Sequence, residues 1–256
     1  MKNKMRALSI CIIVLIVAFF CADAYAEPIF PFRFGFEVEP ATNPQEVSST
    51  IQILLILTVL SLAPSILIMM TCFTRIIIVF SFLRNALGTQ QMPPNQVLIG
   101  LALFLTLFIM SPVISEINTT AYAPYNKGEI TQQEAFDNAS ASIKKFMLKQ
   151  FGDNEKELAF FVQLAKIETP VEPMNLPLTV IIPAFILNEL TIAFKIGFLI
   201  YIPFLIIDMV VASTLMSMGM MMLPPVMISL PFKILLFIMV DGWSLVTKTL
   251  VTSFIT

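Results

Sequence analysis

The chain has 256 residues, of which 57% are hydrophobic and only 12% are charged, and its mean hydropathy is +0.88. Soluble domains carry roughly 25% charged residues, so the composition indicates an integral membrane protein. The absence of histidine removes the commonest general base and metal ligand. The net charge of −2 offers no basic surface for nucleic acid, and the scattered glycines form no phosphate-binding loop. We therefore expect no enzyme, no cofactor and no nucleic-acid partner.

Residues 1–26 have the pattern of a cleavable secretory signal peptide. Positive charges precede an apolar run over 10–20, and Ala24 and Ala26 form an A-x-A cleavage site before Glu27. An uncleaved first transmembrane helix is the alternative, but the apolar run is short for a membrane span.

Residues 27–50 are rich in proline and polar at intervals. Proline and polar residues at this density are typical of irregular structure. We therefore expect an extended periplasmic arm outside the membrane.

Residues 51–115 predict an apolar helical hairpin. The first arm, over 51–82, is long for one helix crossing a hydrocarbon core of roughly 30 Å, and Pro64 predicts a kink in it. The segment 88–94 turns the chain back. The return arm, over 97–114, ends near Pro112.

Two arginines suggest how this hairpin is oriented. Arg75 and Arg84 lie near the end of its first arm, and positive charges flanking a membrane helix favour the cytoplasmic side. The turn of the hairpin is then cytoplasmic, and the chain that follows the hairpin emerges in the periplasm.

Residues 116–175 contain nearly half of the chain's charges and predict a small, soluble, helical insert facing the periplasm. Thr131 and Glu134 have the spacing of a capping box. Apolar residues then follow at helical spacing: Phe136, Ala139, Ile143, Phe146, Met147 and Phe151. A second helix is expected over 154–166. The charges themselves fit an ordinary solvated surface.

Residues 176–256 form an apolar region rich in methionine and interrupted by isolated charges. Pro183, Pro203, Pro231 and the pair Pro224-Pro225 are expected to break it into pieces. The pattern leaves open whether 178–223 crosses the membrane once, twice, or as a re-entrant hairpin.

The isolated charges of this region each need a partner, water or another subunit, because a charge in an apolar segment is costly. They are Glu189, Lys195, Asp208, Lys233 and Asp241. Glu189 and Lys195 are six residues apart and therefore lie on different helix faces. We predict that Glu189 pairs with Lys233, within the chain or across a subunit boundary. Asp208 and Asp241 fit either a proton-responsive group or an assembly contact or helix end.

Three consecutive methionines, Met220, Met221 and Met222, follow a potential hinge at Gly219 and precede a break at Pro224 and Pro225. Successive helical side chains rotate by about 100°, so the three cannot all face one packing partner. Methionine is flexible and adapts to irregular surfaces. The pattern indicates a deformable seal, and ordinary apolar packing is the alternative.

These residues together resemble the FliP family of flagellar biosynthesis proteins. The resemblance covers the mature chain and is strongest in these segments: 183–190 (PAFILNEL), 194–198 (FKIGF), 202–213 (IPFLIIDMVVAS), 218–225 (MGMMMLPP), 230–233 (LPFK) and 241–243 (DGW).

The resemblance implies an all-α membrane protein whose apolar helical hairpins pack into an oligomeric gate for type III protein export, in the inner membrane at the flagellar basal body. It implies that several copies assemble with FliQ and FliR, that FlhB lies near the entrance, and that unfolded flagellar proteins pass through. Met220, Met221 and Met222 would correspond to the family's methionine gasket, and Glu189, Lys195, Asp208 and Lys233 to charges that act in assembly.

Two other classes of protein are compatible with parts of the sequence. One is the equivalent subunit of a virulence-type injectisome, although a leader and a long amino-terminal arm favour the flagellar branch. The other is a polytopic transporter or intramembrane enzyme. The lack of internal repeats disfavours a transporter, and the lack of histidine disfavours a hydrolase.

Overall fold

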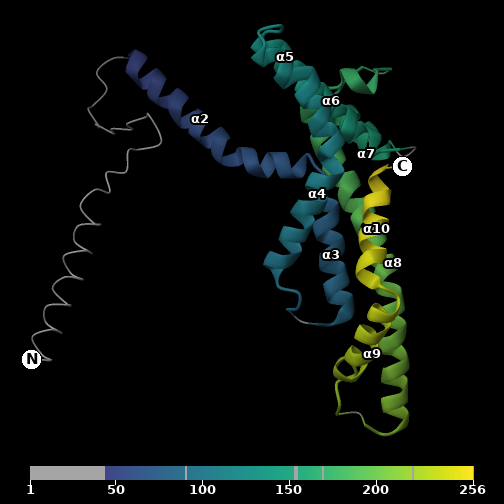
Figure 1. Ribbon diagram of the computed structural model, residues 1–256. Helices are drawn as coiled ribbons and strands as arrows, with labels where there is room; N and C mark the ends of the chain where they lie inside the picture. Colours follow the sequence, from purple (N-terminus) through teal and green to yellow (C-terminus); the bar gives the residue numbers. More distant parts are fainter. Residues whose placement is uncertain (1–43, 90, 153–154, 169, 221, 256) are drawn as a thin grey trace, which may run out of the picture. The chain divides into compact units, whose positions relative to one another are not determined.

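The computed structural model describes residues 44–89, 91–152, 155–168, 170–220 and 222–255, and all regular structure in these ranges is helical (Figure 1). The prediction of an all-α membrane protein is therefore confirmed. The expected signal peptide and residues 27–43 of the expected arm lie outside the described residues. The chain divides into two units, Met1–Leu54 and Leu55–Thr256. The second unit contains every helix discussed below apart from the first turns of α2.

Helix α2, Pro44–Met69, begins inside the predicted arm, so residues 44–50 are helical and not extended. Pro64 lies within α2 and does not end it. The first apolar arm instead breaks at residues 70–72, where the Thr71 hydroxyl accepts a hydrogen bond from the Phe73 N–H at 3.4 Å. A threonine hydroxyl that bonds to the backbone two residues on competes with the helical hydrogen bond.

The predicted first arm, 51–82, is divided between α2 and α3, Phe73–Leu87, and the return arm lies in α4, Asn95–Ile117. Gly88 ends α3 in the left-handed conformation (φ 72°). The return arm does not end near Pro112, which lies inside α4. A π-helical turn, Asn118–Tyr122, carries α4 directly into the short helix α5, Ala123–Asn126.

The charged region that follows is helical, as predicted. It contains α6, Gln132–Lys149, α7, Lys156–Leu164, and a 3-10 turn at Pro173–Asn175. The capping box is present: the Thr131 N–H donates to Glu134 Oε2 at 2.8 Å, and the Glu134 N–H donates to Thr131 Oγ1 at 3.3 Å. α6 packs on α4 and α8, and α7 packs on α8.

The apolar stripe predicted for α6 is buried only at its carboxyl end. Phe146, Met147 and Phe151 belong to the core, whereas Phe136 is 67% exposed. The first turns of α6 extend past the helices that cover its last turns, so helical spacing alone did not identify which part of the stripe is buried.

The last third contains α8, Leu178–Ser217, α9, Pro225–Met239, and α10, Gly242–Ile255. The predicted breaks at Pro183, Pro203 and Pro231 are wrong, because all three prolines lie inside continuous helices. A proline removes one backbone donor and strains the turn before it, and an apolar helix supported by neighbours tolerates this loss.

Within the described ranges, two helices are long and apolar enough to cross a membrane: Asn95–Asn126, which joins α4 to α5, and α8. A third span is possible if α9 and α10 count as one, although they are bent by 63°. Asp241 lies at this bend with a positive φ of 49°, a conformation that aspartate tolerates better than most residues.

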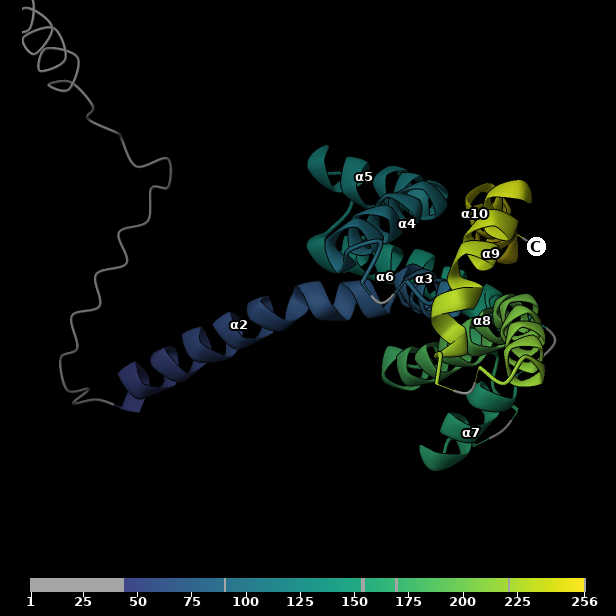
Figure 2. The same cartoon turned by 90° about the horizontal axis from the view of Figure 1, so that it is seen from below.

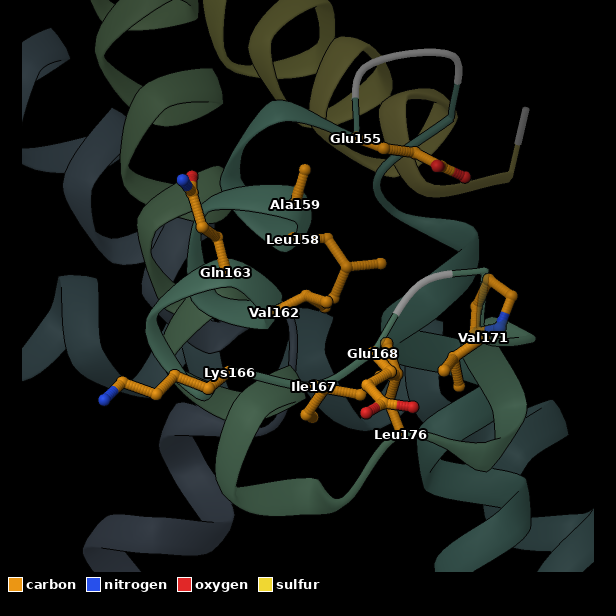
Figure 3. Close-up of a pocket in the computed structure, with 11 residues that line it drawn as sticks. Glu155, Leu158, Ala159, Val162, Gln163, Lys166, Ile167, Glu168, Val171 and Leu176 are labelled. Carbon is orange, nitrogen blue, oxygen red and sulfur yellow. The ribbon is translucent and has the colours of Figure 1, made fainter.

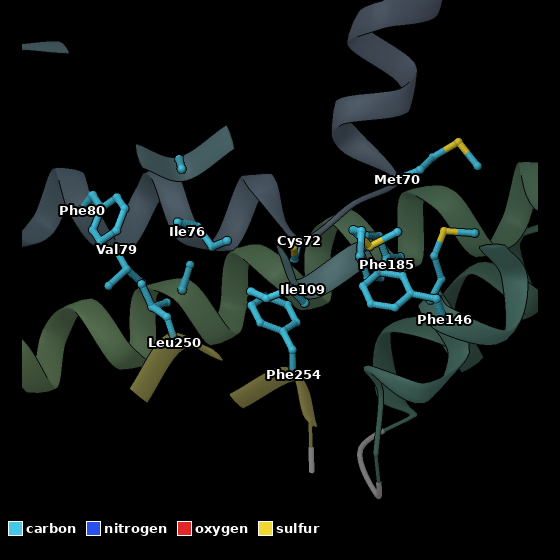
Figure 4. Packing of buried hydrophobic residues seen from close by; sticks show 14 of the residues in the cluster. Met70, Cys72, Ile76, Val79, Phe80, Ile109, Phe146, Phe185, Leu250 and Phe254 are labelled. Atoms are coloured by element: carbon cyan, nitrogen blue, oxygen red, sulfur yellow. The ribbon is translucent and has the colours of Figure 1, made fainter. Parts of the chain in front are cut away.

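The core lies where α3 packs along α8, and these two helices form the largest contact of the second unit. Seen from below, α4 and α7 lie on opposite sides of α8 (Figure 2). Figure 4 shows Val79 of α3 near Leu250 of α10, and Phe185 of α8 near Phe146 of α6. This core brings together residues of α3 and α10, which are far apart in the sequence.

Candidate functional site

A fully buried ion pair joins α3 to α8. The Arg75 Nε donates to Glu189 Oε2 at 2.8 Å, and Nη2 donates to Oε1. Side-chain exposure is 1% for Arg75 and 0% for Glu189. The two parallel hydrogen bonds have the bidentate geometry in which a guanidinium and a carboxylate bind most strongly.

The same guanidinium also fixes the end of α10. Arg75 Nη1 donates to the Ser253 carbonyl at 3.1 Å and to its hydroxyl at 3.0 Å. Arg75 Cζ lies 3.7 Å from the centre of the Phe254 ring, a cation–π distance. Arg75 therefore connects three helices through one buried side chain.

A second ion pair joins α8 to α9. Lys233 Nζ lies 2.6 Å from Asp208 Oδ2 and donates to the Ala86 carbonyl of α3 at 3.1 Å. The Ser229 hydroxyl donates to the other oxygen, Asp208 Oδ1, at 2.5 Å. Lys233 and Ser229 are buried, and the Asp208 side chain is 25% exposed.

The predicted pairing of Glu189 with Lys233 is therefore wrong. Each has a different partner in this chain, Arg75 and Asp208 respectively. That prediction paired charges of the last third with one another, and the positive-inside rule placed Arg75 near the cytoplasmic end of the first apolar arm. Arg75 is instead a core residue in α3, and of these two arginines only Arg84 lies near the turn. The available signal was Arg75's position inside an apolar run, which required a partner as much as Glu189 did.

The remaining isolated charges lie at the surface. Lys195 is exposed on α8, and none of the ion pairs in the described part of the chain includes it. Asp241 is exposed at the bend between α9 and α10. Its position agrees with the helix-end interpretation.

The methionine triplet lies in the loop between α8 and α9. Gly219, with φ 75°, ends α8: its N–H bonds to the Met216 carbonyl at 3.1 Å, and the Met220 N–H bonds to the Leu215 carbonyl at 3.0 Å. This bonding pattern is a Schellman motif, which favours glycine at the left-handed position. The predicted hinge residue is thus a helix terminator.

Pro224 and Pro225 define the other end of the loop. Pro225 is the first residue of α9, where its missing N–H costs no helical hydrogen bond. Met222 is 99% exposed and Met220 46% exposed; Met221 lies outside the described residues. The loop therefore presents at least two methionine side chains that this chain leaves largely uncovered.

The described residues offer little for catalysis or metal binding. They contain no group of three or more cysteine or acidic residues that could hold a metal ion, and Cys72 is fully buried. A hollow of 520 Å³ lies against α7 (Figure 3). Leu158, Val162 and Ile167 line it together with exposed charges such as Glu155 and Lys166. This lining supplies no activated nucleophile.

Comparison with known proteins gives a consistent result. A profile of the FliP family matches residues 56–250. The flagellar biosynthetic protein FliP of Bacillus subtilis (strain 168) is 61% identical over 214 residues, covering 84% of this chain and 96% of that protein. The protein of the same name from Aquifex aeolicus is 53% identical over 219 residues, covering 85% and 91%. That of Treponema pallidum is 51% identical over 226 residues, covering 88% and 83%.

Proposed function

The chain belongs to the FliP family and is a membrane component of the flagellar export apparatus, and we propose that it is a pore-forming subunit of the export gate. In this proposal several copies surround a channel through which unfolded flagellar proteins cross the inner membrane. The methionine loops close that channel at rest. The subunit has no enzymatic activity of its own.

The observation that carries the proposal is the methionine loop. Its two ends are fixed by backbone features, the Schellman motif at Gly219 and the proline start of α9. Between them, Met220 and Met222 are exposed. In a symmetric ring, equivalent loops from neighbouring copies meet around one axis. Flexible methionine side chains from several copies could then fill the opening and yield to a passing chain.

A stripe of exposed apolar side chains along α8 supports assembly with other copies or related subunits. Its residues are spaced by seven and four, which places them on one helix face: Leu187, Phe194, Phe198, Leu205, Met209 and Met216. An apolar face of this length is typical of an interface with another protein or with lipid. We propose that other copies of the chain, FliQ and FliR cover it, and that FlhB binds near the entrance.

The ion pairs have a specific place in this proposal. Arg75–Glu189 and Lys233–Asp208 are satisfied within one chain, so they support assembly by fixing α3, α8, α9 and α10 as a unit. Lys195, which is exposed, remains as a charge for contact with a neighbouring subunit. The charged insert is proposed to face the periplasm.

The assembly is tested by native mass spectrometry of the chain purified alone and co-expressed with FliQ and FliR. We expect a discrete complex that contains several copies of the chain and both partners. A stable monomer that ignores both partners would contradict the proposal and favour a self-contained transporter.

The seal is tested by replacing Met220, Met221 and Met222 with alanine. We expect assembly to continue and small ions to leak through the complex in liposomes, because alanine removes the flexible part of the seal. A matched control replaces three exposed methionines elsewhere: Met92, Met174 and Met239. An ion-tight triplet variant that still exports normally would rule out the gasket.

A further inference from the structure

A second hollow lies between α4, α6 and α10, apart from the methionine loop and the ion pairs between α8 and its neighbours. Its volume is 270 Å³. One part of its lining is apolar: Ile109, Pro112, Val113, Phe146 and Phe254. The other part is polar: Glu116, Ser142, Lys145, Lys149 and Gln150.

The apolar and polar parts lie at different depths along α4. Between Asn95 and Ser115 this helix carries no charged residue, and Glu116 is the first. The nineteen residues over 97–115 rise about 29 Å at 1.5 Å each, close to the roughly 30 Å of a hydrocarbon core. A span over 97–115 would therefore place Glu116 at the membrane boundary. Ile109, Pro112 and Val113 lie one to two turns inside it.

The two lysines lie at the level of this boundary. Lys145 Nζ is 3.0 Å from Glu116 Oε1, and the Lys145 side chain is 67% exposed. Lys149 is exposed one turn further along α6. With two lysines and one glutamate, the polar part of the lining is net positive. Lysines placed at the membrane interface attract anionic lipid headgroups.

We propose that this hollow binds one anionic phospholipid. The phosphate lies between Lys145 and Lys149, and an acyl chain lies along Pro112, Val113 and Phe254. Phe254 also stacks on Arg75, so the acyl chain would cover the ring that closes the buried ion pair. The lipid thus reinforces the attachment of α10 to the core.

The proposal is tested by native mass spectrometry of the full chain in detergent, titrated with phosphatidylglycerol. We expect one retained lipid, with clearly weaker retention of zwitterionic phosphatidylethanolamine. The double substitution Lys145→Gln and Lys149→Gln should weaken phosphatidylglycerol binding by about fivefold to 25-fold, since each interfacial lysine contributes roughly fivefold. The control Lys156→Gln with Lys166→Gln removes the same charge from α7 and the turn that follows it, and should change nothing.

The substitution Glu116→Gln gives the sharper test, because it should tighten binding of phosphatidylglycerol. It frees Lys145 from its carboxylate partner and makes the site more positive. The pair is exposed, and exposed pairs contribute little to folding. A purely structural role for the pair predicts no change or weaker binding in this variant.

Glycerol phosphate serves as a probe without acyl chains. We expect it not to compete with phosphatidylglycerol at equal concentration, because the apolar wall contributes to binding only when a chain lies on it. Equal retention of the two phospholipids, an unchanged affinity in the double lysine variant, or full competition by glycerol phosphate would each overturn the proposal.

Discussion

Arg75 and Glu189 show why a buried charge can be tolerated in this apolar chain. Every donor that the guanidinium directs into the core has an acceptor, in Glu189 or in Ser253. A buried ion pair recovers the cost of removing two ions from water only with such geometry. The pair therefore fixes how α3, α8 and α10 fit together, even though its net contribution to stability is small.

Replacing one partner of the Arg75–Glu189 pair should lower the stability of the protein far more than replacing both partners. Glu189→Leu or Arg75→Met alone leaves a buried charge without a partner, at a cost of about 3–5 kcal/mol. We expect either variant to give little folded protein. The double variant should recover much of the yield, because two apolar side chains of similar size can replace a buried pair.

Thermal unfolding and size-exclusion yield in detergent measure this difference. Lys195→Met serves as the control, because Lys195 is exposed on the same helix. If the double variant were as unstable as the single variants, the stability would come from contacts to Ser253 and Phe254 and not from charge pairing.

At the scale of helices, the close packing of α3 on α8 depends on Gly197. A Cβ atom built there would lie 2.6 Å from Phe82 Cγ and 3.0 Å from Phe82 Cβ. The second contact is close to the α3 backbone, so rotation of the ring alone cannot relieve it. Gly197 therefore sets the distance between the two helices that contain the core.

Gly197→Ala should lower the stability by about 1–3 kcal/mol, the usual cost of overpacking. Gly100→Ala is the matched control: Gly100 lies inside α4 with nothing within 4 Å of an added Cβ. That substitution should raise the stability by about 0.5–1 kcal/mol, because alanine is the better helix former. Melting temperatures of both variants in detergent measure these effects. Equal shifts of the melting temperature in the two variants would contradict the packing argument.

The capping box of α6 should make its first turn sensitive to acid. The Thr131 backbone N–H, followed by the Thr131 hydroxyl, holds the pKa of Glu134 below its usual range, which is roughly 4.3 in unfolded chains. A lowered pKa in the folded state stabilises the helix above the unfolded value. This stabilisation is lost as the pH falls through the folded value.

Hydrogen exchange over residues 131–138 measures the effect, with each pH compared against the Glu134→Gln variant. Glutamine still accepts the Thr131 N–H but does not titrate in this range. Near neutral pH we expect the amide protons of this turn to exchange at the same rate in both proteins. Near pH 3, roughly one unit below the ordinary glutamate pKa, we expect them to exchange faster in the unsubstituted chain than in the variant. Equal exchange rates in the two proteins at every pH would mean that protonation of Glu134 does not weaken the capping box.

Local patterns predicted some elements well and others poorly. The capping box at Thr131 marked the start of α6, because a cap depends on residues three apart in the sequence. The prolines led to wrong predictions of helix breaks, because Pro183 and Pro203 lie within α8, whose packing partners no local pattern reveals. Glu189 required a partner by its burial alone, but the identity of that partner depends on how α3 lies against α8. Residues 114 positions apart cannot be matched by periodicity.

At the scale of the whole molecule, α8 is too long for a simple span. Its 40 residues correspond to about 60 Å of helix, roughly twice the hydrocarbon thickness. An upright α8 would therefore carry its exposed apolar stripe well beyond the lipid. This mismatch agrees with the proposed oligomer, in which protein surfaces cover the part of the stripe that lipid cannot reach.

The contacts of Arg75 also have a consequence for biosynthesis. Its partner Ser253 comes 178 residues later, almost at the end of the chain. During translation Arg75 is synthesised early, and its acceptors on Ser253 become available only after α10 has emerged. A chain without α10 therefore leaves Nη1 of Arg75 without its Ser253 acceptors, although Glu189 still neutralises the charge, and leaves an apolar seam open.

A chain terminated after Asp241, which lacks α10, should therefore be degraded rapidly in cells. Pulse-chase labelling would measure its lifetime against the full chain. Combining the truncation with Arg75→Met and Glu189→Leu should lengthen that lifetime, since no buried guanidinium donor is then left without an acceptor. An unchanged lifetime in the combined variant would assign the degradation to the exposed seam alone. Attachment of α10 to Arg75 would in this way act as a checkpoint, so that only subunits in which α10 has packed on the core are available for assembly.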